Sequence, residues 1–327
     1  MDQLTSTLLS ETAPGKTKQF LADVTAGLKS SPKRLSSKYF YDANGDKIFQ
    51  ELMNCEEYYP TNCELEIFSK KTEQLAAAIT HDDTPFDLIE LGAGDASKSS
   101  YLLKYLLEQK KDFTYMPIDI SDNVISYLNI TLPVTLPGID INGLNGEYFE
   151  MLQKAASISD RRKVVMFLGS NIGNMPAKEA KEFCRELRSH LSPGDQLLIG
   201  IDLQKSPKTV LAAYNDSQGI TKRFNLNLLH RINRELSGNF NLNQFDHYAM
   251  YDPESGACKS YLVSLAEQKV KVGSEEFYFK KDEYIYMEIS QKFTVEQTGE
   301  MAREAGFTPV QELLDSKNWF MDAIWKA

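Results

Sequence analysis

The stretch FDLIELGAGDASK, from Phe86 to Lys98, contains residues whose types and spacing suit the binding of a nucleotide or a similar ligand. An apolar run typical of a buried parallel strand stops at Gly92-Ala93-Gly94, where a helical pattern begins. Glycine permits positive φ and lets a ligand approach the backbone, and the free N–H groups of the following helix attract polar or anionic groups. The same residues also suit a tight strand-to-helix turn that binds no ligand.

Asp119 ends the next predicted strand, FTYMPIDI, one strand-helix unit after the glycine turn. A carboxylate at this place accepts hydrogen bonds from ribose hydroxyls in dinucleotide sites. The alternative is an N-cap of the next helix, although Ser121 or Asp122 would fill that role equally well. Ser97 stands where a dinucleotide fingerprint has its third glycine. The pattern therefore favours S-adenosylmethionine over a nicotinamide dinucleotide.

A third candidate lies in IYMEISQKF, which predicts a strand over 285–293. Because side chains alternate along a strand, Tyr284, Tyr286, Glu288 and Ser290 share one face, and the residues between them form an apolar face. A carboxylate and a hydroxyl two residues apart can hold a planar donor such as an imidazole or an amide. A solvated sheet face explains the same alternation.

The elements that position these residues form an alternating series. Apolar runs and helical periodicity predict strands at 86–91, 113–120, 164–168 and 196–202, and helices at 98–110, near 122–130 and at 177–191. Strands that alternate with helices of this size indicate a parallel sheet with helices on both faces. Ligands of such sheets bind at the carboxyl ends of the strands.

The alternation stops between Ser206 and Tyr284, which we interpret as an inserted substrate domain. A polar helical region comes first, and strands follow near 247–251, 258–272 and 276–280; after 285–293 the pattern predicts a helix at 295–305 and strands at 307–314 and 320–325. Before the series, the sequence predicts amphipathic helices within residues 1 to about 30 (Leu4 and Leu8 among their apolar residues), a turn at 42–45, a helix from 46 toward 54, and a helix around 64–79.

The composition is that of an ordinary globular protein, with 42% hydrophobic and 25% charged residues. The net charge of −10 opposes a general phosphate-binding surface, so we expect a small-molecule substrate and no nucleic acid. No apolar run approaches the length of a membrane span, and the start lacks a basic region before an apolar one, so we expect a cytoplasmic protein. The four cysteines lack CxxC spacing and the histidines, His81 included, lack metal-ligand spacing, so no metal is expected.

An ordered set of motifs carries a broader resemblance. KYFYDANGDKIFQELMNCEEYYPTNCELEIF, IELGAGDASKS, PIDIS, FLGSNIGNM, LSPGDQLLIGIDLQK, AAYND, TKRFNLNLL, NRELSGNF and EISQKF occur in that order. From about Ser36 to the C-terminus the chain resembles the L-histidine Nα-methyltransferases, which form hercynine in ergothioneine biosynthesis with S-adenosylmethionine as methyl donor. The family's substrate insertion falls where the strand-helix alternation breaks.

The resemblance implies roles for individual residues. Gly92, Lys98 and Asp119 match residues around S-adenosylmethionine, and Tyr41 matches a tyrosine near both cofactor and substrate that would orient the reacting amine. Tyr58, Asn174 and Tyr214 match residues that hold the amino and carboxylate groups of histidine. Glu288 and Ser290 match the pair that binds the imidazole, which supplies a ligand for the strand described above.

Two positions depart from the family pattern. The family usually has Gly-Asp and an aromatic residue at the adenine, and the nearest match here is Gly146-Glu147-Tyr148. The family also tends to place methionine over the substrate ring, where this chain has Ser260. The serine would remove an apolar wall and enlarge the pocket, so Ser260 bears on which amino acid is accepted more than on the reaction.

These observations predict an α/β fold: a Rossmann-like class I methyltransferase sheet with helices on both faces, plus a second α+β substrate domain. The expected cofactor domain comprises 63–204 and 293–327, and the expected substrate domain 1–62 and 205–292. The expected activity is transfer of three methyl groups to the α-amino group of free L-histidine by a monomeric enzyme without a metal. The alternatives are methylation of another amino acid or small amine, and a non-catalytic S-adenosylmethionine-binding protein.

Overall fold

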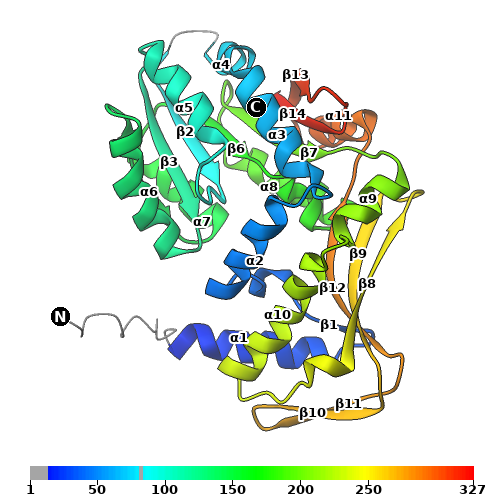
Figure 1. The fold of residues 1–327 in the computed structure, drawn as a ribbon. Helices are drawn as coiled ribbons and strands as arrows, with labels where there is room; N and C mark the ends of the chain where they lie inside the picture. The colour runs from blue at the N-terminus through cyan, green and yellow to red at the C-terminus, as the bar shows by residue number, and fades with distance from the viewer. Residues whose placement is uncertain (1–13, 81–83) are drawn as a thin grey trace, which may run out of the picture. The chain divides into compact units, whose positions relative to one another are not determined.

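The computed structural model, drawn in Figure 1, describes residues 14–80 and 84–327. The chain divides into two compact units. Unit 1 comprises Met1–Glu57, Leu211–Met250 and Lys259–Glu288, and unit 2 comprises Tyr58–Val210, Tyr251–Cys258 and Ile289–Ala327. Leu4, Leu8 and His81, named above, lie outside the described residues.

Unit 2 is built on an eight-stranded sheet. Its strands are β2 (Phe86–Leu91), β3 (Phe113–Asp119), β4 (Asp140–Ile141), β5 (Leu144–Asn145), β6 (Arg162–Phe167), β7 (Gln196–Asp202), β13 (Thr308–Leu314) and β14 (Phe320–Lys326). They lie in the order β13-β14-β7-β6-β2-β3-β4, with β5 also paired to β3. β14 is antiparallel to both neighbours, and the pairs from β7 to β4 are parallel. This order confirms the predicted Rossmann-like class I methyltransferase sheet.

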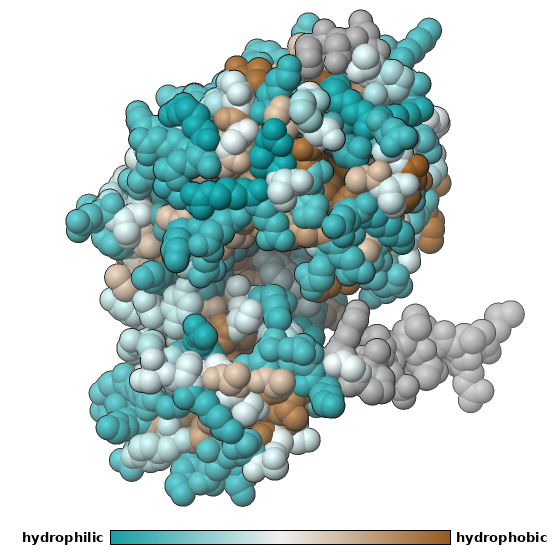
Figure 2. Space-filling model, turned by 180° about the vertical axis from the view of Figure 1, so that it is seen from behind, coloured by the Kyte–Doolittle hydropathy of each residue, from teal (hydrophilic) through white to brown (hydrophobic). Residues whose placement is uncertain are grey.

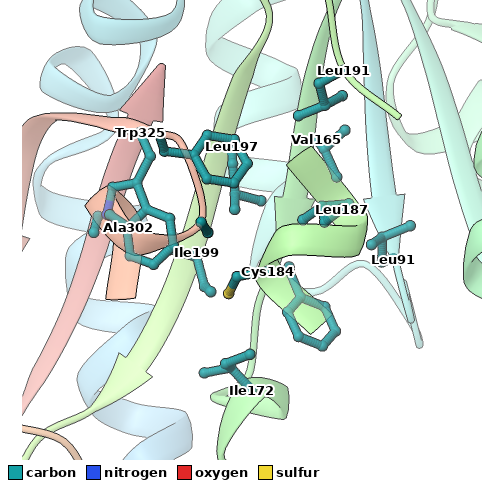
Figure 3. Packing of buried hydrophobic residues seen from close by; sticks show 14 of the residues in the cluster. Leu91, Val165, Ile172, Cys184, Leu187, Leu191, Leu197, Ile199, Ala302 and Trp325 are labelled. Carbon is teal, nitrogen blue, oxygen red and sulfur yellow. The ribbon is translucent and has the colours of Figure 1, made fainter. Parts of the chain in front are cut away.

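Helices pack against this sheet (Figure 1). In unit 2 they are α3 (Tyr59–Lys70), α4 (Thr72–Ile79), α5 (Ser99–Glu108), α6 (Asp122–Thr135), α7 (Tyr148–Ile158), α8 (Ala177–Ser189) and α11 (Val295–Glu304), with the short helix η2 (Asn171–Asn174) after β6. Figure 3 shows Cys184 and Leu187 of α8 beside strand residues such as Val165 and Leu197. All four are fully buried. Burial of one such aliphatic side chain contributes about 1.5–3 kcal/mol, so this layer fixes where the strand ends lie.

β2 and β7 are buried at every position, which explains why both strands could be predicted from their sequences. Strands covered on both faces are nearly continuous apolar runs. The observed bounds of β2 and β7 equal those predicted.

Unit 1 contains α1 (Pro14–Lys29), β1 (Lys33–Arg34), η1 (Ser37–Tyr39), α2 (Ala43–Met53), α10 (Ile220–Glu235), η3 (Leu242–Gln244), β10 (Gln268–Val272) and β11 (Glu275–Phe279). The division between the units falls within α9 (Pro207–Tyr214), β8 (Phe245–Asp252), β9 (Ala257–Ser264) and β12 (Tyr284–Gln291). A four-stranded sheet has the order β1-β12-β9-β8, and β10 pairs antiparallel with β11. On β12, Ile285, Met287 and Ile289 are buried, as the alternation predicted.

Several details differ from the sequence prediction. The predicted turn at 42–45 is the start of α2, because the Asp42 carboxylate caps the helix by accepting from Gly45 N at 2.7 Å. The strand predicted over 258–272 is two strands, β9 and β10, and the helix predicted over 64–79 is two helices, α3 and α4. Helix α7 was not predicted.

The surface and the cysteines agree with the composition. Figure 2 shows a mostly hydrophilic face on which hydrophobic residues occur in smaller groups. All four cysteines lie within the described residues, are buried, and form no disulfide there. Within residues 14–80 and 84–327, no helix is long and apolar enough to cross a membrane, and no cluster of three or more metal-ligating side chains occurs.

Candidate active site

The residues predicted for the site are divided between the two units. Unit 1 holds Tyr41, Tyr214 and Glu288, and unit 2 holds Tyr58, Gly92, Lys98, Asp119, Glu147, Tyr148, Asn174 and Ser290. Several of the unit 2 residues lie at or just after the carboxyl ends of β2, β3 and β6, which is where parallel sheets bind ligands.

Unit 2 brings Gly92, Asp119 and Tyr148 together. Gly92 has φ of +72°, and a Cβ at this position would lie 2.8 Å from the Tyr148 hydroxyl, so no other residue fits well. The Asp119 carboxylate accepts from Ser121 N at 2.8 Å and from Gly94 N at 3.4 Å. It therefore links the end of β3 to the glycine turn after β2.

Burial has the largest effect on the pKa values of Asp119 and Tyr148. Burial raises the pKa of Asp119, and the backbone N–H groups of Ser121 and Gly94 oppose that rise by stabilising the carboxylate. Burial, followed by the nearby Asp119 and Glu147 carboxylates, raises the pKa of the Tyr148 hydroxyl to about 12. Tyr148 is therefore a neutral hydrogen-bonding group at physiological pH.

The Gly146-Glu147-Tyr148 segment lies beside β3 because β5, which precedes it, pairs with the end of that strand. Gly146 N donates to the Asp119 carbonyl at 3.1 Å, and φ of Gly146 is +155°. Glu147 is exposed and is the N-cap residue of α7, and Tyr148 begins that helix. The loosely matched adenine motif thus lies directly beside Asp119.

Lys98 has a defined partner inside unit 2. Its ammonium pairs with the buried Glu64 carboxylate of α3. Burial lowers the pKa of Lys98, but the charge and the hydrogen bond of the Glu64 carboxylate outweigh that effect and raise it. Burial and the Glu64 carboxylate hold the pKa of Asp322 far above its usual range. Lys98 is therefore a charged residue whose position is fixed by acidic neighbours.

Glu64 also holds the loop that carries Asn174. Its Oε1 accepts from Gly169 N at 2.7 Å, at the start of the GSNIGN loop. Ser170 in this loop has φ of 56°, a left-handed conformation that is uncommon for serine, and its Oγ accepts from Asp202 N at 3.0 Å. Strained backbone of this kind gathers at functional sites.

Asn174 ends this loop as an exposed residue, and its Nδ2 donates to Asn171 Oδ1 at 3.2 Å. Gly173 lies so close to β12 that a Cβ there would be 2.7 Å from the Gln291 carbonyl oxygen. Because Gln291 follows Ser290, the loop with Asn174 lies next to the strand end with Ser290. Unit 2 thus brings these two predicted substrate residues into one neighbourhood.

The three predicted tyrosines have different surroundings. Tyr41 is 48% exposed, with ring centroids 5.5 Å from Phe49 and 5.6 Å from Phe224, both in unit 1. Tyr214 ends α9 and is buried, whereas Tyr58 is half-buried at the N-cap of α3. Of the three, Tyr41 has the hydroxyl-bearing ring most open to a ligand.

Glu288 has a hydrogen-bond partner on α10. Asn225, which is fully buried, donates from Nδ2 to Glu288 Oε1 at 3.1 Å and to the Thr221 carbonyl at 3.1 Å. Ser260, at the family's methionine position, is 1% exposed, and its Oγ has no hydrogen-bond partner within the described part of the chain. An unpaired buried hydroxyl costs about 1–3 kcal/mol.

Four buried residues received no role from the sequence: Glu64, Asp202, Asn225 and Lys292. Asp202 had a signal, because it ends a buried strand at the ligand-binding edge of the sheet. Lys292 lay in the EISQKF motif but is a charged residue between buried neighbours. Glu64 and Asn225 are polar residues on the buried faces of helices, which a periodicity argument treats as surface.

The groups around Gly92 fit S-adenosylmethionine chemically. Asp119 offers a carboxylate for ribose hydroxyls, and the Gly92 turn presents backbone at a point that excludes a side chain. Tyr148 adds a neutral aromatic ring and hydroxyl beside the turn. Donors and acceptors of these kinds suit a nucleoside with an uncharged base.

Comparison with known proteins is consistent with this geometry. Residues 20–327 match the family described as "Histidine-specific methyltransferase, SAM-dependent". The histidine N-alpha-methyltransferase of Mycolicibacterium smegmatis is 34% identical over 302 residues, which cover 92% of this chain and 90% of that protein. Ergothioneine biosynthesis protein 1 of Schizosaccharomyces pombe is 28% identical over 293 residues, which cover 87% of this chain and 38% of that protein. The 4-dimethylallyltryptophan N-methyltransferase of Epichloe festucae var. lolii is 26% identical over 306 residues, which cover 86% of this chain and 88% of that protein.

The family match confirms the resemblance found in the sequence, the cofactor, and the class of reaction. It extends over nearly all of the described residues, so both units are included. The chain belongs to the S-adenosylmethionine-dependent, histidine-specific methyltransferases, and it is an N-methyltransferase of that family.

Proposed function

We propose that this enzyme methylates the α-amino group of free L-histidine three times in succession and releases Nα,Nα,Nα-trimethyl-L-histidine, hercynine. S-adenosylmethionine supplies each methyl group from its sulfonium. The protein has to hold an unprotonated amine in line with that group, and orientation of this kind can lower a barrier by about 7–11 kcal/mol. No covalent enzyme intermediate is needed.

The observation that carries the choice of histidine is the polar pair on β12. Glu288, held by Asn225, offers an acceptor, and Ser290, two residues along the same strand, offers a hydroxyl. A neutral imidazole has one N–H donor and one lone-pair acceptor, which this pair can match. Sites that hydrogen-bond a substrate N–H strongly reject analogues that lack it.

The remaining roles follow the family pattern as proposals. Tyr41 orients the amine, and Tyr58, Asn174 and Tyr214 hold the amino and carboxylate groups of the substrate. The exposed amide of Asn174 and the exposed ring of Tyr41 are compatible with ligand contact. Gly92, Lys98, Asp119, Glu147 and Tyr148 form the cofactor side of the site.

A second candidate is Nα-methylation of a larger amino acid. Two observations favour it: the small residue Ser260 stands at the family's methionine position, and one relative carries the name of a tryptophan-derivative methyltransferase. Competition between histidine and other free amino acids in one reaction separates the two candidates. The proposed function requires kcat/KM for histidine to exceed that for tryptophan by about 10⁴-fold or more, the scale on which a hydrogen-bonding site rejects an analogue that lacks a matching group.

The test of the proposed function is mass spectrometry of histidine incubated with the enzyme and S-adenosylmethionine. The products should appear in the order mono-, di- and trimethylhistidine. Exclusive accumulation of the monomethyl product under excess cofactor would contradict three transfers. The cytoplasmic location and the monomeric state stay predictions, which cell fractionation and light scattering after gel filtration would test.

A further inference from the structure

The segment that carries Tyr41 is held by one face of α10, which lies beside α2 within unit 1 (Figure 1). Residues three and four apart on a helix share a face. The residues of this face follow that spacing: Phe224, Asn227, Arg231 and Arg234. The Phe224 ring packs against the Tyr41 ring, and Arg231 Nη1 donates to the Tyr39 carbonyl at 3.0 Å and to the Tyr41 carbonyl at 3.5 Å.

Asn227 is the buried polar residue of this face. It is 4% exposed, and both ends of its amide form hydrogen bonds. Its Nδ2 donates to Asp42 Oδ1 at 2.8 Å, and its Oδ1 accepts from Asn44 Nδ2 at 2.7 Å. One side chain of α10 therefore joins the residue directly after Tyr41 to the second residue of α2.

Asp42 is the residue at which these contacts meet. Its Oδ1 also accepts from Gly45 N, which caps α2, and its Oδ2 accepts from Arg234 Nη2 at 2.6 Å. Burial raises the pKa of Asp42, but the Arg234 guanidinium, the Gly45 N–H and the Asn227 amide outweigh burial and lower it. Asp42 is therefore an ionised carboxylate, and both of its oxygens are engaged.

Contacts that fix Asp42 also limit where the Tyr41 hydroxyl can lie. The two residues share a planar peptide bond, so a shift of Asp42 changes the backbone of Tyr41. The rotamers open to a side chain depend on its backbone dihedrals, so the ring direction changes with them. Because Tyr41 is 48% exposed, packing surrounds only part of its ring. The backbone on either side therefore has to supply the rest of the restraint.

We propose that Asn227 is a positioning residue for methyl transfer, which holds Asp42 and the start of α2 so that the Tyr41 hydroxyl meets the reacting amine. This inference rests on the proposed function, in which Tyr41 orients that amine. Asn227 acts through Asp42 and not on the substrate itself. The expected effect is on rate, because a misplacement of about 1 Å can slow a reaction about 100-fold.

A double-mutant cycle with Tyr41→Phe tests this role. Tyr41→Phe removes the hydroxyl but keeps the ring that packs against Phe49 and Phe224. Asn227→Asp places a carboxylate within hydrogen-bond distance of Asp42, and the two like charges repel.

The measurement is the rate of the first methyl transfer to histidine in a single turnover. Asn227→Asp should slow this transfer about tenfold in the wild-type background. In the Tyr41→Phe background it should slow the transfer by less than about twofold, because the hydroxyl that it displaces is already absent. Losses that multiply would overturn the proposal, since a residue that serves only the stability of unit 1 would act independently of the Tyr41 hydroxyl.

Asn233→Asp is the matched control on the same helix. The Asn233 amide also bonds at both ends, donating to the Phe240 carbonyl at 2.7 Å and accepting from Phe240 N at 2.7 Å. These contacts hold the segment after α10, so the control should lower the midpoint of urea unfolding and leave the rate of methyl transfer within about twofold of wild type. A loss of rate as large as that of Asn227→Asp would overturn the proposal, because any weakening of α10 would then suffice.

Arg234→Met takes the place of Asn227→Asp in the cycle if that variant does not fold. The Arg234 side chain is 46% exposed, and its loss removes the cation from Asp42. The rate of methyl transfer should fall about threefold in the wild-type background and stay unchanged in the Tyr41→Phe background. Equal losses in both backgrounds would overturn the proposal.

Failure of this inference can be told apart from failure of the proposed function. A wild-type enzyme that forms no methylated histidine overturns the proposed function and this inference with it. A Tyr41→Phe variant as fast as wild type removes the role of Tyr41, and the role of Asn227 falls with it. A wild-type enzyme that methylates histidine, with multiplying losses in the cycle, overturns only the role of Asn227.

Discussion

The amide of Asn225 donates to Glu288 Oε1 at 3.1 Å, which joins the middle of α10 to the strand that carries the proposed imidazole contacts. Asn225 is fully buried, and it also donates to the Thr221 carbonyl one turn earlier. Glu288 is thus held in place on one side by a neutral donor.

Glu288→Ala should weaken histidine binding by about 10- to 100-fold, because a hydrogen bond to a charged group contributes about 1.5–3 kcal/mol. Calorimetry in the presence of S-adenosylhomocysteine measures this change. Unchanged histidine affinity in this variant would remove Glu288 from the substrate site.

Asn225→Asp should weaken histidine binding by about tenfold, although residue 225 acts through Glu288 and would not itself contact the substrate. The new carboxylate would face Glu288 within hydrogen-bond distance, and repulsion between like charges would raise the pKa of Glu288 and turn it away. Asn225→Ala, which removes the donor without adding a charge, is the control and should have a smaller effect. Equal affinity in Asn225→Asp and wild type would show that Asn225 does not orient Glu288.

A pair of substitutions at Lys98 and Glu64 can separate the structural role of Lys98 from a role in binding the cofactor. Lys98→Met alone leaves the buried Glu64 carboxylate without its cation, so the free energy of unfolding should fall by about 3–5 kcal/mol. Glu64→Gln with Lys98→Met removes both charges and should recover most of that loss in urea unfolding. If Lys98 also contacts the cofactor, the double variant still binds S-adenosylhomocysteine weakly; full recovery of binding would assign Lys98 a structural role alone.

Gly200 on β7 should tolerate no side chain. A Cβ there would overlap Glu64 Oε1 and lie 3.2 Å from Asp322 Oδ1, so Gly200→Ala should lower the free energy of unfolding by about 2–3 kcal/mol. Gly15→Ala is the matched control, because nothing lies within 4 Å of its Cβ position. Equal stability of the two variants would show that the Glu64 carboxylate moves aside easily.

Because the pKa of His247 is lowered, we expect the stability of the fold to depend on pH. Burial lowers its pKa to about 4, against an ordinary value of 6.5, although Asp246 and Asp216 oppose the shift. Between these two values the unfolded chain binds the proton and the folded chain does not. Stability from this group is therefore complete above pH 6.5 and is lost as pH falls toward 4, by up to about 3 kcal/mol.

The comparison that isolates His247 is wild type against His247→Gln in urea at pH 7 and pH 4.5. Glu90, whose pKa burial raises to about 7, titrates in the same range with the opposite sign, but it does so in both proteins. The difference in unfolding free energy between the two proteins should shrink or reverse at the lower pH. A difference that is independent of pH would show that the pKa of His247 is the same in the folded and the unfolded chain.

The sequence was most informative where burial is continuous. β2 and β7 could be located because strands covered on both faces are nearly continuous apolar runs, and Asp119 was identified because it ends the neighbouring strand β3. Helix α7 was missed although it begins in the proposed adenine motif. The boundary between β9 and β10 was missed because the short segment 265–267 between them contains no glycine or proline.

The contacts made by buried charges could not be predicted. A lysine at position 292 gives no indication that Asp202 is its ion-pair partner. Asp202 is distant in sequence and meets Lys292 only after the sheet has formed. The same holds for Glu64, whose partners Gly169 and Lys98 come from separate loops. Family motifs located the residues proposed to contact ligands, and the structure was needed to find the residues that orient them.

The most direct test of the account is the reaction of purified enzyme with S-adenosylmethionine and an equimolar mixture of free amino acids, followed by mass spectrometry. We predict that histidine alone is converted, through mono- and dimethyl forms, to the trimethyl product. Preferential methylation of another amino acid, or cofactor binding without any methylated product, would contradict it.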